Sequence, residues 1–121
     1  FAASGASGVF FQSTHETPDL AAFLDLPANK PAPVTTTIIG RDVAGVERVV
    51  FIRTALVYRE GGGFAIIGPS GVQSDFTDKS DLLLDGTLFV NGADNNIYSR
   101  IVGLLVTTIN WRVIMLAQGV G

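Results

Sequence analysis

The end of the chain carries the pattern that most constrains its fold, a strict alternation of apolar and polar side chains. Between residues 108 and 117 every odd position is apolar, whereas Thr108, Asn110 and Arg112 begin the opposite face. A repeat of two residues is typical of a β-strand with one buried face and does not fit the helical repeat. Trp111, on the apolar face, is predicted to be a core residue whose indole N–H finds a carbonyl acceptor near the sheet edge.

Six further segments rich in β-branched and aromatic residues are also predicted to be strands. Breaks containing Gly, Pro or Asp separate them and favour turns. The segments span residues 34–39, 46–59, 64–67, 82–84, 87–91 and 96–102. The last of them and residues 108–117 are predicted to form a closing β-hairpin. The pattern as a whole indicates an all-β fold, an antiparallel β-sandwich or jelly roll of about seven or eight strands.

The first third of the chain differs in composition, with a Gly/Ala/Ser-rich opening and a Pro-rich end. We therefore expect an extended N-terminal arm or linker over residues 1–33 and a sandwich domain over residues 34–121. Within the arm, Thr17 as N-cap and Pro18 at the first helical position predict one short helix over residues 17–24. The arm is too short to bury its own apolar side chains, so five of them are predicted to be assembly residues that dock on the sandwich or on a neighbouring subunit: Phe10, Phe11, Leu20, Phe23 and Leu24.

Composition excludes several classes of function for this 121-residue chain. Only 16% of its residues are charged, below the ~25% usual for soluble domains, so we expect a partner to cover some apolar surface. The net charge of −3 and the scattered Lys and Arg argue against nucleic-acid binding. No cysteine is present, which excludes disulfides and thiolate chemistry. The longest uncharged apolar runs, such as residues 101–109, are too short to cross a bilayer, so no membrane span is expected.

His15 is the only histidine, and it lies beside Glu16 with Ser13 nearby. A Ser/His/acid arrangement needs groups held on rigid elements that are far apart in sequence, together with a fixed oxyanion hole. Neighbours within a Pro- and Gly-flanked arm do not meet this requirement. We therefore predict no catalytic residue, and we interpret His15 as a solvated or interface side chain.

Asp75, Asp78 and Asp81 follow one another at a spacing of three, and residues 94–96 add further oxygen donors. Calcium binds six to eight such oxygens, so a calcium site is an open alternative here. Solvated turns are the favoured reading, because Lys79 lies inside the cluster and aspartates commonly form turns. Residues 61–63 are three glycines without the Lys-Ser or Lys-Thr pair of a phosphate-binding loop. No metal site and no cofactor are predicted.

Three segments, residues 47–59, 65–67 and 97–111, resemble in order and spacing the small β-sandwich modules of bacteriophage tail-fibre and head-appendage proteins. The nearest points of resemblance are Val102-Gly103 and Ile109-Asn110-Trp111. The resemblance implies a non-enzymatic structural component of an extracellular virion, with no catalytic residues to carry over. It also implies a homo-oligomer, a trimer being favoured, in contact with other virion proteins and with loops that touch a host receptor.

Two other functions stay open on the residues alone. A receptor- or carbohydrate-binding adhesion module would present an exposed aromatic such as Tyr98 in a shallow groove, although Tyr58, Tyr98 and Trp111 all lie in predicted strands, where packing is the favoured interpretation. A small β-barrel enzyme would need titratable residues clustered in a pocket, which the single histidine and dispersed acids disfavour.

Overall fold

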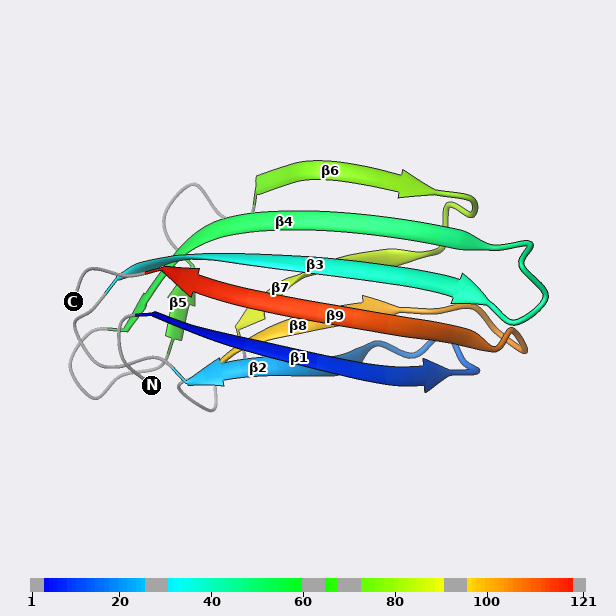
Figure 1. The fold of residues 1–121 in the computed structure, drawn as a ribbon, viewed down its shortest axis with the longest axis horizontal. Helices are drawn as coiled ribbons and strands as arrows, with labels where there is room; N and C mark the ends of the chain where they lie inside the picture. Colours follow the sequence, from blue (N-terminus) through cyan, green and yellow to red (C-terminus); the bar gives the residue numbers. More distant parts are fainter. Residues whose placement is uncertain (1–3, 26–30, 60–64, 68–72, 91–95, 119–121) are drawn as a thin grey trace.

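The structure, a computed structural model, describes residues 4–25, 31–59, 65–67, 73–90 and 96–118, in which nine strands form two antiparallel sheets (Figure 1). Six strands make one sheet, in the order β1-β9-β3-β4-β5 with β6 also paired to β4, and three make the other, in the order β2-β8-β7. The all-β, two-sheet prediction is confirmed. The strands are β1 (Ser4–Ser13), β2 (Asp19–Asp25), β3 (Ala32–Asp42), β4 (Arg48–Arg59), β5 (Ala65–Ile67), β6 (Gln73–Lys79), β7 (Asp85–Val90), β8 (Asn96–Val102) and β9 (Ile109–Gln118).

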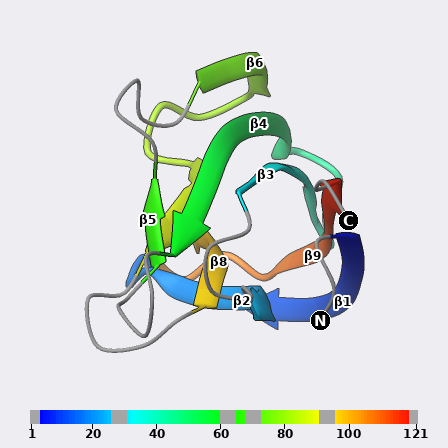
Figure 2. The ribbon, with the colours of Figure 1, turned by 90° about the vertical axis from the view of Figure 1, so that its left-hand side faces the viewer.

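The core lies between the sheets and follows from the period-two pattern of the strands. Alternate residues of β3 and β9 are buried, and the residues between them are half-buried or exposed. Figure 2 shows the larger sheet curving round the smaller one. Each large aliphatic or aromatic side chain buried here contributes roughly 1.5–3 kcal/mol relative to leaving it in water. The largest fully buried side chains include Trp111, Phe51, Ile38, Leu84, Ile97, Ile101, Ile109 and Met115.

Trp111 is the core anchor that the alternation predicts, with 2% of its surface exposed. Its indole N–H donates a hydrogen bond to Ser13 Oγ at 2.8 Å, so the acceptor is a hydroxyl on β1 and the predicted carbonyl is wrong. Gly40 on β3 lies against the indole ring, because a Cβ at that position would come within 2.6 Å of Trp111 Cε3. The position of the indole ring therefore depends on the Ser13 hydroxyl, which accepts its hydrogen bond, and on the absence of a side chain at Gly40.

One buried polar contact joins the two sheets. The hydroxyls of Thr36 on β3 and Ser99 on β8 are 2.6 Å apart, and both residues are fully buried. Burying a hydroxyl without a partner is costly, so each of these groups satisfies the other.

The short helix predicted over residues 17–24 is not formed. Asp19–Asp25 is strand β2, which pairs with β8 and turns Ala22 and Leu24 inward. A two-turn helix is marginal without tertiary support, and β8 supplies a ladder of backbone hydrogen bonds to the extended chain. Residues 4–13 of the predicted arm are strand β1, paired along β9. Within one chain, both segments are integral strands of the sandwich.

The predicted hairpin of the last two strands is also wrong. β8 pairs with β2 and β7 in the three-stranded sheet, whereas β9 pairs with β1 and β3 in the six-stranded sheet. The chain crosses from one sheet to the other between residues 102 and 109. Two consecutive apolar strands fit either arrangement, and only the packing of the other strands decides between them.

Two element assignments in the middle of the chain need correction. Residues 82–84, predicted to be a strand, lie in the turn before β7, and part of the predicted aspartate-rich loop is strand β6. A partner strand explains β6, since its polar residues pair with the long strand β4. In the part of the chain that the structure describes, no helix is long and apolar enough to span a membrane.

Candidate functional site

The outer face of the six-stranded sheet, turned away from the core, carries large apolar side chains where a solvated sheet face is usually polar. Each lies on a strand whose neighbouring residues point into the core, so the outward side of the sheet is partly apolar, with threonines, arginines and an aspartate between these residues. We call this surface the outer face. Its exposed apolar residues are Phe10 on β1, Ile114 and Leu116 on β9, Ile39 on β3, Leu56 on β4 and Phe76 on β6.

The strand register gathers these side chains into contiguous rows. Ile39 on β3 lies directly opposite Val50 on β4, and Ile52 on β4 lies opposite Phe76 on β6, so two apolar rows each join two neighbouring strands. The first row continues into Arg112 on β9 and Asp78 on β6, and the second continues into Thr37 on β3. Directly opposite side chains on one face are close enough to touch. Five strands at ~4.8 Å spacing make the face about 20 Å wide. Exposed apolar side chains gathered on one face in this way are typical of an interaction site.

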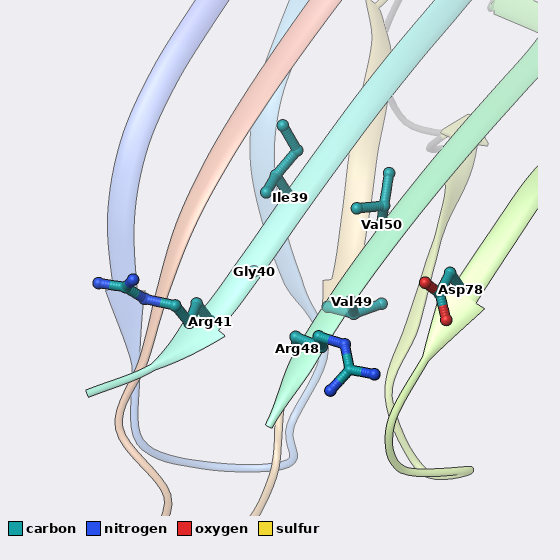
Figure 3. Close-up of a pocket in the computed structure, with 7 residues that line it drawn as sticks. All are labelled: Ile39, Gly40, Arg41, Arg48, Val49, Val50 and Asp78. Carbon is teal, nitrogen blue, oxygen red and sulfur yellow. The ribbon is translucent and has the colours of Figure 1, made fainter. Parts of the chain in front are cut away.

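Charged side chains border one end of the outer face (Figure 3). Arg41 on β3 and Arg48 on β4 are directly opposite each other and exposed, and Asp78 on β6 stands opposite Val50 one row further in. These residues line a shallow cavity of about 180 Å³ floored by Val50 and Ile39. No described carboxylate forms an ion pair with either arginine. Like charges directly opposite in a sheet repel each other, and Asp78 is the carboxylate that lines the same cavity.

A second apolar surface lies at one end of the sandwich, where three loops present pairs of exposed aliphatic residues. Leu82 and Val106 are the most exposed of the six, each at 88%. Val106 has a φ of 55°, a left-handed conformation that is strained for a β-branched residue. A cavity of about 290 Å³ lies between two of the loops. The six residues are Val43 and Val46, Leu82 and Leu83, and Leu105 and Val106.

Asp42 holds the first of these loops in shape. Its carboxylate accepts hydrogen bonds from the backbone N–H groups of Val46 at 3.2 Å and Glu47 at 3.3 Å. Burial acts to raise the pKa of Asp42, but these backbone hydrogen bonds prevail and hold the pKa below its ordinary value. Gly45, with a φ of 76°, completes the turn. The aspartate therefore acts as a structural cap.

Aromatic side chains form a row across the outward side of the three-stranded sheet. Phe23 on β2 and Phe89 on β7 both lie opposite Tyr98 on β8. The rings of Phe23 and Tyr98 are 6.0 Å apart, and the Arg100 guanidinium lies 5.2 Å from the Phe89 ring centre. Phe23 is 52% exposed. This row places Tyr98, named in the adhesion alternative, beside an exposed aromatic side chain.

The five predicted assembly residues divide into two groups. Leu24 is buried in the core, and Phe11 is half-buried and stacked on Trp111 with ring centres 6.3 Å apart. Phe10, Leu20 and Phe23 remain exposed, Phe10 on the outer face and the other two on the three-stranded sheet. Only these three are available to a partner while the chain keeps this fold.

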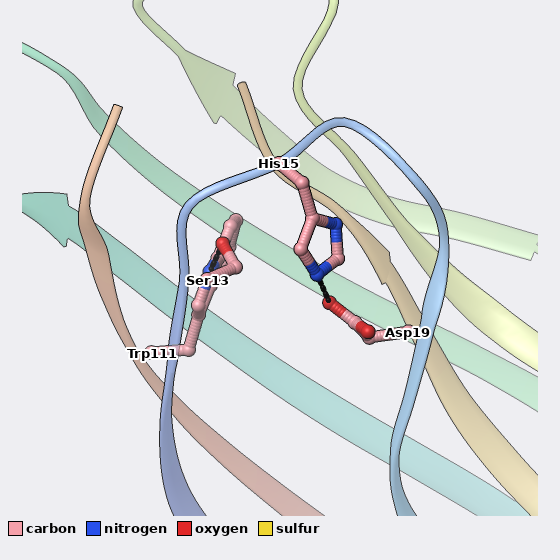
Figure 4. A network of polar contacts seen from close by, with 4 residues as sticks. All are labelled: Ser13, His15, Asp19 and Trp111. Atoms are coloured by element: carbon pink, nitrogen blue, oxygen red, sulfur yellow. Dashed lines mark hydrogen bonds and ion pairs between the residues drawn. The ribbon is translucent and has the colours of Figure 1, made fainter. Parts of the chain in front are cut away.

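Ser13 and His15 do not form a catalytic arrangement (Figure 4). The Ser13 hydroxyl is buried against the Trp111 indole, whereas His15 Nε2 lies 3.5 Å from Asp19 Oδ2, both side chains being partly exposed. The histidine pairs with an acid that sequence analysis had not linked to it. With the serine engaged elsewhere, the pair has no nucleophile.

The three aspartates of the open calcium alternative do not converge. Asp75 accepts a hydrogen bond from the Thr54 hydroxyl, and Asp81 Oδ1 accepts one from the Leu83 amide at 2.9 Å. Among the described residues, no group of three acidic or histidine side chains is placed to hold a metal ion. Residues 94 and 95 lie outside the described part of the chain.

Arg53 is a buried charge whose role the sequence did not reveal. Its guanidinium carbon lies 4.8 Å from the centre of the Phe51 ring, and its Nη1 donates a hydrogen bond to the Phe76 carbonyl at 2.7 Å. Burial lowers the pKa of Arg53, and the nearby Asp85 and Asp75 act in the opposite direction. The contact spans the irregularity where β6 shifts register against β4, so Arg53 is a structural residue.

No protein-family model matches the chain, and no curated protein sequence matches it. A solved structure with a similar fold is the tailspike protein of Acinetobacter baumannii phage AM24. The two superpose with a TM-score of 0.56 at 8% sequence identity, over 98% of this chain and 27% of the tailspike chain. The chain shares its fold with part of a phage tailspike. At this identity the likeness is one of fold, and this chain spans 27% of the tailspike's length.

Proposed function

We propose that this chain is a non-enzymatic structural module of a bacteriophage or phage-like particle, located in the virion. The observation that carries the proposal is the outer face, whose apolar rows stay exposed in a single chain. A surface of this kind favours assembly, in which other copies or other virion proteins cover it. The fold likeness to part of a phage tailspike supports the same context. A homo-oligomer, with a trimer favoured, is the expected arrangement.

The proposal includes assembly contacts from the first 33 residues, but only through three side chains. Phe10, Leu20 and Phe23 are exposed, so each is available to a neighbouring copy. β1 and β2 are strands of the sandwich, and exchange of one of them between copies would be a domain swap. Deleting residues 1–33 would remove two strands, so single substitutions of the three exposed residues are the cleaner test of their part in assembly.

The test of the structural role is the composition of the particle itself. Particles purified from the source of this sequence should contain the chain at a fixed stoichiometry, measured by quantitative mass spectrometry. The soluble fraction after removal of particles is the control. A chain that stays in the soluble fraction while particles form normally would contradict the proposal.

A second candidate function is receptor or carbohydrate adhesion, and the aromatic row on the three-stranded sheet favours it. Aromatic faces stack on sugar rings, and Arg100 beside Phe89 offers hydrogen-bond donors. Binding on a glycan array that Phe23→Ala abolishes would support adhesion. Phe10→Ala, which removes an exposed aromatic from the opposite sheet, is the matched control.

A further inference from the structure

We propose that the outer face binds a second copy of this chain, with Asp78 of one copy set against Arg41 and Arg48 of the other. The pairing deepens the proposed structural role, and it rests on that role because a particle module is expected to meet copies of itself. Three features of the face lead to this partner: its apolar rows, its unbalanced charges and its extent.

The apolar rows supply the central contact. Val50 and Ile52 project from the middle strand β4, with Ile39 beside one of them and Phe76 beside the other. Ile39, Val50 and Ile52 lie on strands with ladders on both sides, and Phe76 lies on β6, which pairs with β4, so regular strands hold the surface in place. A rigid apolar surface loses little conformational entropy when it is covered.

The charges identify the partner. Arg41 and Arg48 repel each other across the strands and have no ion-pair partner among the described residues. Asp78 is an exposed carboxylate on the same face and lines the same cavity as both arginines, without an ion pair to either of them. One chain therefore carries both the positive and the negative partners of an ion pair, but they do not form one within the chain. A second copy supplies the missing carboxylate to the arginines and receives the arginines at its own aspartate.

Self-complementarity of this kind suits a symmetric assembly. In a two-fold contact each pairing occurs twice, and in a closed ring the arginine side of each copy meets the aspartate side of the next. In either case Asp78 continues the row of Ile39 and Val50, the two arginines lie one row further out, and complementary charge sets the register of the contact. Like-charged pairs would arise in other registers and disfavour them.

The extent of the face fits a contact between proteins. The outward residues of β1, β9, β3, β4 and β6 all belong to it. A stable interface covers about 800 Å² on each partner. A face about 20 Å wide on long strands reaches that order of size.

Charge reversal tests the pairing directly. The mass of the purified chain, 12.7 kDa as a monomer, is measured by light scattering over a broad range of concentrations. Wild type should form a multimer. Asp78→Arg and Arg48→Asp alone should each weaken self-association by about tenfold or more, because each sets like charges against each other. The double variant restores opposite charges and should recover most of the loss.

Asp25→Arg is the matched control, because it makes the same charge change at an exposed position on the other sheet and should leave the mass unchanged. Asp78→Asn, which only removes the charge, should weaken association less than Asp78→Arg. Far-UV circular dichroism checks that each variant is folded. A wild-type monomer at every concentration would overturn the pairing, as would a multimer that neither reversal weakens or that the double variant fails to restore. None of these three outcomes would change whether the chain is detected in purified particles. Failure of the pairing is therefore distinct from failure of the structural role.

Discussion

At the scale of single residues, Gly40 shows how closely the core is packed around Trp111. A Cβ on Gly40 would lie 2.6 Å from two ring carbons of Trp111 and 2.9 Å from Val49 Cγ1. Gly40→Ala is expected to lower the free energy of unfolding by about 1–3 kcal/mol, as overpacking does. Gly8→Ala is the matched control, since its Cβ would come no nearer than 3.7 Å to Val113 O. Urea denaturation followed by tryptophan fluorescence measures both, and equal stability of the two variants would contradict the packing.

Val106 is a residue whose backbone conformation costs energy. A left-handed φ is unfavourable by roughly 1–2 kcal/mol for an L-residue and is tolerated by glycine. Because glycine also raises the entropy of the unfolded chain, Val106→Gly is expected to raise the free energy of unfolding by only about 0.5–1 kcal/mol. Thermal unfolding measures the change. Leu105→Gly, at the neighbouring exposed position without a positive φ, should instead lower stability, and a Val106→Gly variant that behaves like it would argue against strain.

At the scale of the elements, Asp42 makes the turn between β3 and β4 sensitive to pH. Its folded pKa lies below the ordinary value of 3.8, so its contribution to stability is complete above that value. As the pH falls below 3.8 and through the folded pKa, the contribution is lost. Asp42→Asn should therefore be less stable than wild type at neutral pH, with the difference narrowing in acid.

Chemical denaturation at a series of pH values measures this difference. Asp25→Asn changes an exposed carboxylate at the end of β2 and should leave neutral-pH stability nearly unchanged. If the difference in free energy of unfolding between wild type and Asp42→Asn stayed constant as the pH falls, the Asp42 carboxylate would not be what holds the turn.

At the scale of the whole molecule, the Thr36–Ser99 hydrogen bond ties the two sheets through a largely apolar interior. Thr36→Val leaves the Ser99 hydroxyl buried without a partner and is expected to cost about 1–3 kcal/mol. Adding Ser99→Ala removes the orphaned hydroxyl and should recover much of that loss. A double-mutant cycle by urea denaturation measures the coupling. Strictly additive effects would show that the two hydroxyls act independently.

The two sheets also differ in what their outward sides offer. The six-stranded sheet presents aliphatic rows with a charged border, and the three-stranded sheet presents the aromatic row with Arg100. If a second copy of the chain covers the outer face of the six-stranded sheet, the aromatic row on the three-stranded sheet stays available to another ligand. Assembly and adhesion therefore need not compete within one particle module.

Local side-chain chemistry was sufficient to predict the strands whose alternation is unbroken. Asn96–Val102 was predicted as observed, and Trp111 was placed in the core, because inward and outward residues alternate whichever strands lie alongside. Local sequence patterns gave the wrong prediction for Asp19–Asp25, because the preceding Thr17-Pro18 resembles a helix N-terminus. They also gave the wrong prediction for β6, because its polar residues resemble a loop. In both cases a partner strand outweighed local preference.

For the candidate site, too, the sequence predicted one part of the arrangement and not the other. The low charge content predicted that some apolar surface would be covered, and Phe10 was among the side chains predicted to contact a partner. The sequence alone did not place Phe76, Ile39 and Asp78 on one face, because their neighbourhood depends on the register of strands far apart in the chain. The sequence by itself determined the all-β class and the inward residues of its regular strands, since alternation is a local property. Only the tertiary structure decided which strands pair, which sheet each joins and which faces stay uncovered, since strand pairing joins distant segments.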